Sequence, residues 1–284
     1  MKTLTANADL QGDRFLRALI TVGSAFCLGI VPLAHAAQAL PGPNPGQLPR
    51  EAKPISDVVV PIPSEIFGSL DKFTNSNWRA VQLSALAHSK PHGDQTQIAL
   101  LLGVVIAEGF IAVEAKDAAE VKEIGSAVLT LARALGVEPT VMRRSRSIVE
   151  YAEKNDWAAV RKEWDGVLPD VQQGMKELKS EQLSQLVSVG GWLRGTDALT
   201  ALILQRYSVE GAQLLRQPAL LDYFEKQLSE MDSNVSVSKM EEGVREMRVL
   251  VACSDRPISE KAVRELAVLC DELLGTVDAK AASR

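Results

Sequence analysis

A single carboxylate stands within an apolar stretch of the sequence. Residues 98–113 are apolar on every side apart from their glycines, and Glu108 is the one charged residue among them. A helix that is hydrophobic all round is buried, so Glu108 needs a cation or hydrogen-bond donors to remain charged. It could then bind a ligand or transfer a proton. Alternatively, it reaches solvent at a helix end or forms a structural ion pair, for which Arg143, Arg144 and Arg146 are the candidates.

The same three residues, Arg143, Arg144 and Arg146, form the densest basic cluster of the chain. Three guanidinium groups could together hold a phosphate or a carboxylate. The alternative is a solvated helix face on which Glu150 and Glu153 balance the positive charge, because charge runs on helices are usually exposed. A small anionic ligand is one hypothesis for this cluster.

A further candidate site lies at residues 190–195, where three glycines surround Trp192 and Arg194. Each glycine inside a helix costs up to about 1 kcal/mol, so the group indicates a special requirement. Close helix packing or a kink would explain the glycines. A binding groove would also explain them, with Trp192 as its apolar wall and Arg194 as the anchor for an anion.

The histidines and motifs favour neither a metal site nor a catalytic centre. Beyond residue 36 the chain has only His88 and His92, and Pro91 interrupts the helix that would place both on one face. There is no G-x-G-x-x-G, Walker, C-x-x-C or C-x-x-C-H motif and no nucleophile elbow. We predict no catalytic residue, no bound metal and no cofactor, and an enzyme is the less favoured class.

The elements that must position these residues are predicted to be helices throughout. From about residue 64 the apolar residues recur at steps of three and four, most regularly between Asp117, an expected cap, and Gly136, an expected terminator. Further helices are predicted at 139–154, 157–167, 171–178, 181–194, 197–207, 209–216 and 219–231, with breaks at Pro169, Ser180, Gly195, Ser208 and Pro218. The predicted fold class is all-α: a helical bundle or an irregular α-solenoid of about ten helices, with residues 64–231 as its body.

Residues 232–284 are predicted to form a C-terminal antiparallel helical hairpin, either as a separate unit or within the same domain. Two apolar seams define its helices: Met240, Val244, Met247 and Val251, then Val263, Leu266, Cys270 and Leu273. Cys253 would lie beside the turn and Cys270 well up the second helix. Because a disulfide needs Cα atoms within about 7 Å of each other, we predict that both thiols are unpaired.

Residues 1–36 are predicted to be a secretory signal peptide. Arg14 and Arg17 precede an apolar run that ends in Ala34-His35-Ala36, a small-residue cleavage pattern. The alternative is a retained membrane anchor, although the apolar run is shorter than the roughly 20 residues that a span needs. Residues 37–63 are rich in proline and are predicted to be an extended linker. The expected location is the periplasm or the exterior, with a membrane link only through an uncleaved leader.

Composition and net charge reduce the number of function classes that the sequence allows. Hydrophobic residues make up 46% and charged residues 24% of the chain, as in ordinary globular proteins. The net charge of -5 offers no field that would attract nucleic acid. We therefore expect an exported all-helical interaction or scaffold protein that binds another macromolecule or itself. The alternative is a carrier of a small apolar or anionic ligand in an inter-helix pocket near Glu108, Trp192 and Arg194.

Overall fold

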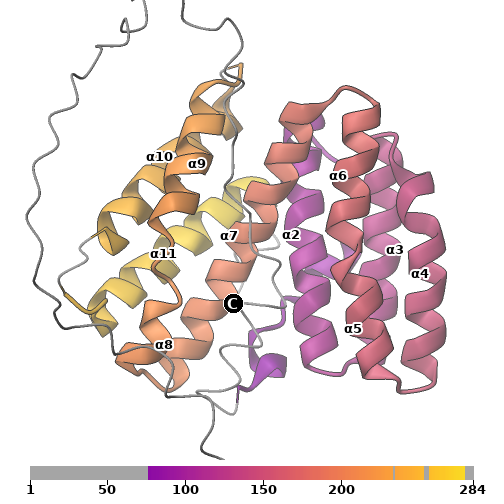
Figure 1. Ribbon diagram of the computed structural model, residues 1–284, viewed down its shortest axis with the longest axis horizontal. Coiled ribbons are helices and arrows are strands. Elements are labelled where there is room, and N and C mark those ends of the chain that lie inside the picture. The colour runs from indigo at the N-terminus through magenta and orange to yellow at the C-terminus, as the bar shows by residue number, and fades with distance from the viewer. Residues whose placement is uncertain (1–75, 233, 253–255, 279–284) are drawn as a thin grey trace, which may run out of the picture. The chain divides into compact units, whose positions relative to one another are not determined.

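The protein is all-α throughout the part of the chain that the structure describes. This computed structural model describes residues 76–232, 234–252 and 256–278, all within one compact unit that spans Ser56–Arg284. These residues form ten α-helices and two short 3-10 helices and contain no strand (Figure 1). The predicted helical bundle is thereby confirmed. The predicted signal peptide, the proline-rich linker and Cys253 lie outside the described residues.

The centre of the molecule is helix α2 (Gln95–Glu114), which packs most extensively against α7 (Glu181–Gln205). The two helices run side by side in Figure 1, and every residue of α2 from Ala99 to Val113 is buried. By length and composition α2 could cross a membrane, but 83% of its most apolar window is buried inside the protein. The predicted buried central helix is confirmed.

Glycines allow α2 and α7 to approach closely. A Cβ on Gly103 would collide with the main-chain carbonyl of Val187, and a Cβ on Gly190 would collide with that of Leu100. The predicted break at Gly195 is wrong, because α7 continues through it to Gln205. Packing against α2 supplies the stability that the glycine-rich segment lacks as an isolated helix.

Helix α3 (Ala118–Ala134) packs on α2, and three further helices follow it in the chain. They are α4 (Glu138–Glu153), α5 (Trp157–Asp165) and α6 (Val167–Glu177). The Asp117 side chain caps α3, and Gly136 follows that helix with a φ of 79°, as the sequence predicts. Pro169 does not separate two helices but lies in the first turn of α6. Backbone N–H groups in a first turn make no hydrogen bond within the helix, so a proline there breaks none.

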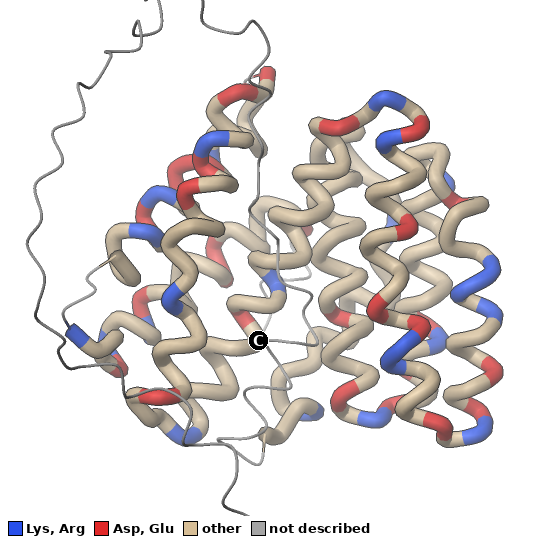
Figure 2. The backbone as a smooth tube through the Cα atoms, in the orientation of Figure 1, with Lys and Arg blue, Asp and Glu red and all other residues tan. Residues whose placement is uncertain are grey.

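The other side of α7 is covered by the C-terminal helices. After α8 (Val209–Gln213) come α9 (Pro218–Ser229), α10 (Val235–Val251) and α11 (Glu260–Val277). Helices α10 and α11 pack against each other as the expected hairpin, while α10 also packs on α9 and α11 on α7. All residues of the two predicted seams are buried, Cys270 among them. Charges of both signs are interspersed along the outer faces of these helices (Figure 2).

The first described segment is not the regular helix that its apolar spacing predicts. It forms two 3-10 helices, η1 (Trp78–Val81) and η2 (Ser84–His88). Between them Gln82 is extended, with φ -65° and ψ 142°. The main-chain groups of this segment make bonds to other helices, so they do not complete a continuous helical ladder.

Candidate functional site

Two of the predicted site residues meet in the interior. Glu108 is near the middle of α2 and Arg194 is in α7, and both side chains are fully buried. Arg194 donates to Glu108 Oε2 from Nε at 2.7 Å, and its Nη2 lies 2.6 Å from the same oxygen. Glu108 therefore forms the structural ion pair that the sequence allowed, but its partner is Arg194, 86 residues away, and not an arginine of α4.

The remaining hydrogen bonds of this pair hold the chain's own backbone. The Leu83 N–H donates to Glu108 Oε1 at 2.7 Å, and Arg194 Nη2 donates to the carbonyl of Val81 at 2.5 Å. Arg194 Nη1 donates to Asp197 Oδ2 at 2.8 Å. The carboxylate and the guanidinium thus bind the C=O of Val81, the last residue of η1, and the N–H of Leu83, the residue before η2. These hydrogen bonds hold α2, α7 and the segment that contains η1 and η2 together.

Trp192 and Arg194 do not share a groove. Residues two apart on a helix point to nearly opposite sides, and Trp192 accordingly faces α9. Its ring lies 5.5 Å from that of Phe224, centroid to centroid, and its Nε1 donates to Gln217 at 3.3 Å. The structure brings Glu108 and Arg194 together and leaves Trp192 in a separate packing contact.

The arginines of α4 do not converge either. Arg144 donates to Asp170 at 2.7 Å and to Glu163 at 3.0 Å, and the hydrogen bond with Asp170 raises the pKa of the guanidinium. Arg143 and Arg146 are exposed. These two residues lie on the solvated helix face that the sequence offered as the alternative, whereas Arg144 joins α4 to α5 and α6, and Glu150 pairs with Lys154.

Sequence reasoning did not identify Glu120 as a carboxylate whose pKa is raised. Glu120 of α3 is half-buried, and burial raises the pKa of its carboxyl group, while a hydrogen bond from Ser84 partly lowers it. The negative charge of Glu108 adds a further rise. A raised pKa in the folded state favours folding at low pH and opposes it as the pH rises through that pKa, so Glu120 is a cost to stability at neutral pH.

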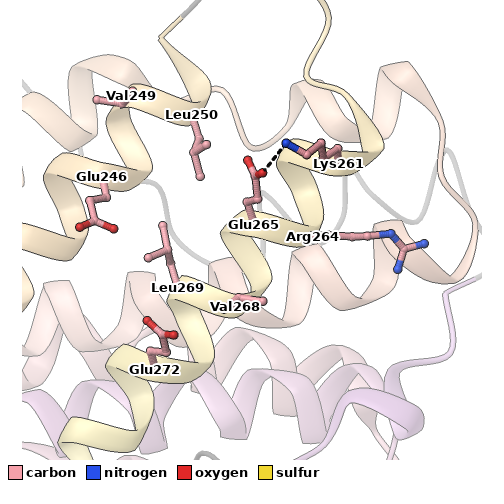
Figure 3. A pocket seen from close by; sticks show the side chains of 9 residues that line it. All are labelled: Glu246, Val249, Leu250, Lys261, Arg264, Glu265, Val268, Leu269 and Glu272. Carbon is pink, nitrogen blue, oxygen red and sulfur yellow. Dashed lines mark ion pairs between the residues drawn. The ribbon is translucent and has the colours of Figure 1, made fainter.

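A surface groove between α10 and α11 is the other candidate site. It has a volume of about 660 Å³. Charged and apolar side chains from the two helices line it: Glu246, Val249, Leu250, Lys261, Arg264, Glu265, Val268, Leu269 and Glu272. Val249 is 71% exposed and Val268 57% exposed. In Figure 3 Leu250 and Leu269 face the groove from its two walls, so its middle is apolar.

Sequence reasoning missed this groove, although a signal was present. Val249 and Val268 lie on the charged outer faces of two helices whose buried seams are already complete. An apolar residue outside the buried seam of an amphipathic helix marks a second surface that can be covered. Whether two such residues are neighbours depends on how the hairpin packs, which periodicity does not specify.

His92 joins the loop before α2 to the end of α11, whereas His88 does not take part in this contact. The His92 ring nitrogens lie 3.0 Å from the carbonyl oxygens of Lys90 and Val277. His88 ends η2 and is exposed. Within the described ranges, no group of three or more His, Cys, Asp or Glu side chains is arranged to hold a metal ion.

Comparisons of this chain with protein-family models, with curated proteins and with solved structures found no match.

Proposed function

We propose that this is an exported, all-helical interaction or scaffold protein that binds a helical segment in the groove between α10 and α11. One observation carries the proposal: Val249 and Val268, both largely exposed, border one apolar groove. Scattered exposed apolar residues are ordinary, but grouped ones rimmed by charges are typical of protein-binding surfaces. Binding a partner would remove these side chains from water.

The form of the groove favours a helix as the bound element. Its walls are two packed helices, and its apolar residues follow α11 at Val268 and Leu269 and α10 at Val249 and Leu250. An amphipathic helix binds such a surface by placing residues of one face between two helices of its receptor. The charged rim would fix the orientation of the bound helix rather than supply most of the affinity.

Export remains a proposal that rests on the predicted leader at residues 1–36. The proline-rich linker at 37–63 would then separate the helical body from any surface to which the chain end is held. Both segments lie outside the described residues. An interaction protein with such a spacer could reach a partner at some distance from its own attachment point.

The carrier alternative has weaker support. A volume of about 660 Å³ suits a small ligand, but the interior pair that the sequence offered for ligand binding is occupied, since Arg194 is bonded to Glu108, Asp197 and Val81. An experiment at the groove can therefore distinguish an interaction protein from a carrier of a small ligand.

Photo-crosslinking in the producing cells tests the proposed function. A photoreactive amino acid at Val268 should form an adduct with a polypeptide, identified by mass spectrometry, and Val249→Asp should abolish that adduct by placing a charge in the groove. The same photoreactive residue at Leu178, which is 52% exposed and follows α6, is the matched control and should give no such adduct.

Two outcomes would contradict the proposal. An adduct that carries only the mass of a small molecule would assign the groove to a carried ligand. The same polypeptide adducts at Val268 and Leu178, both insensitive to Val249→Asp, would show that the groove has no binding role.

A further inference from the structure

We infer that the groove between α10 and α11 binds the same groove of a second copy, so that two chains associate about a two-fold axis near Val268. This inference rests on the proposed function and names the partner. It follows from how charge is distributed along the groove and from the symmetry that this distribution allows.

The groove has an acidic end and a basic end. Glu246 of α10 and Glu272 of α11 lie at one end. Lys261 and Arg264 lie at the other, where Glu265 pairs with Lys261, so the lining residues of that end keep one excess positive charge (Figure 3). Between residues 261 and 272, the exposed positions of α11 are Lys261, Arg264, Val268 and Glu272. The outermost line of α11 thus changes from positive through apolar to negative.

Such a surface is complementary to itself when one copy is turned by 180°. Arg264 and Glu272 stand four residues on either side of Val268, or about 6 Å along the helix axis. When two α11 helices lie antiparallel with their Val268 residues at the same level, the basic end of each copy faces the acidic end of the other. Two-fold symmetry produces every such contact twice.

The middle of the groove supplies the apolar contact. Val268 of each copy would enter the space between Leu250 and Leu269 of the other, and the two hairpins would form a bundle of four helices. Antiparallel helices pack in this way by inserting side chains of one helix between those of its neighbours. Burial of Val249 and Val268 would then stabilise the dimer.

Ion pairs within one copy do not oppose this arrangement. Lys261 lies 3.0 Å from Glu265, and Arg264 pairs with Glu260, each on the same exposed helix face. Exposed pairs of this spacing contribute at most about 0.5 kcal/mol, so exchanging them for pairs between copies costs little. No interior bond has to break.

Charge reversal at each end tests the inference. The protein is purified from the producing cells in the form that they make, and its oligomeric state is measured by sedimentation equilibrium at micromolar concentrations. The acidic variant combines Lys261→Glu with Arg264→Glu, and the basic variant combines Glu246→Lys with Glu272→Lys. Alone, each variant should dissociate at least about tenfold more readily, because like charges then face each other at both ends. An equal mixture of the two should associate again as a mixed dimer.

Val268→Asp should also weaken the dimer, while Leu178→Asp, at an exposed apolar residue after α6, should leave it unchanged. A wild-type chain that stays monomeric, or a dimer that none of the groove variants weakens, overturns the inference. The proposed function is tested separately: a groove adduct with a different polypeptide from a monomeric chain would keep the interaction role and reject the second copy as partner. Absence of any groove adduct would reject both.

Discussion

At the scale of single residues, the interior of the protein depends on a buried ionic cluster, in which Arg194 pairs with Glu108 and with Asp197. Glu108 and Arg194 are fully buried and satisfy each other, while their remaining hydrogen bonds hold Val81, Leu83 and Asp197. Burying charges is costly unless each one is paired and hydrogen-bonded. The intact pair therefore adds little net stability. Removing only one of its two partners, however, destabilises the fold strongly.

Glu108→Gln should lower the free energy of unfolding by about 3 kcal/mol, at the lower end of the cost of breaking a buried ion pair, because Asp197 still pairs with the buried Arg194. Denaturant unfolding at neutral pH measures the change. Glu163→Gln is the matched control, since it removes a carboxylate from the partly exposed pair with Arg144, and it should cost less than about 1 kcal/mol.

The opposite result would be informative. If Glu108→Gln made the protein more stable, the carboxylate would be a burden on the fold, as expected of a group kept for binding or proton transfer. The structural interpretation of the pair would then be wrong.

At the scale of elements, the contact between α2 and α7 organises the bundle. It depends on glycine at positions where the main chain of one helix lies against the other, notably Gly103 and Gly190. The same glycines lower the intrinsic helix propensity of α2 and α7. That cost is offset by burial of the apolar residues on both helices.

Gly190→Ala should destabilise the protein by about 1–3 kcal/mol, because the added Cβ would meet the Leu100 carbonyl and push α2 and α7 apart. Thermal and denaturant unfolding measure the change. In the control, Gly125→Ala within α3, the new Cβ would meet only the Ser145 hydroxyl at 3.9 Å. That variant should gain up to about 1 kcal/mol from better helix propensity.

Equal effects of the two substitutions would contradict this account. Both variants exchange the same residue types inside a helix, so only the close approach of the neighbouring backbone distinguishes them. A neutral or stabilised Gly190→Ala would mean that α2 and α7 can separate at no cost.

At the scale of the whole molecule, the C-terminal hairpin is bound into the body. Helix α11 packs on α7, and α10 packs on α9, so each hairpin helix also covers a helix of the body. Buried residues such as Val263 and Leu274 belong to the same apolar core as those of α2. Removing the hairpin would expose one side of α7.

We expect the hairpin and the body to unfold together. The slowest-exchanging amides of α11, around Cys270, should show the same opening free energy as those in the middle of α2 in native-state hydrogen exchange. The measurement is best made on Val268→Asp, in which association through the groove would not add to the stability of α11. Markedly faster exchange throughout α10 and α11 would instead establish the hairpin as a separately unfolding unit.

Much of the helical architecture could be predicted from the sequence. Apolar spacing and end signals located α3 between Asp117 and Gly136, and the same spacing identified both hairpin seams. The uniform apolarity of residues 98–113 indicated a buried central helix around Glu108. These properties are local, because helix periodicity and capping depend on residues within a few positions of one another.

Tertiary packing decided the features that depend on distant residues. Whether α7 continues through Gly195 is decided by its packing against α2, and the partner of Glu108 is decided by the register of these two helices. The groove likewise exists because Val249 and Val268 come from helices that happen to be neighbours. A sequence states which face of each helix is apolar, but the free energy of packing many such faces together selects which residues meet.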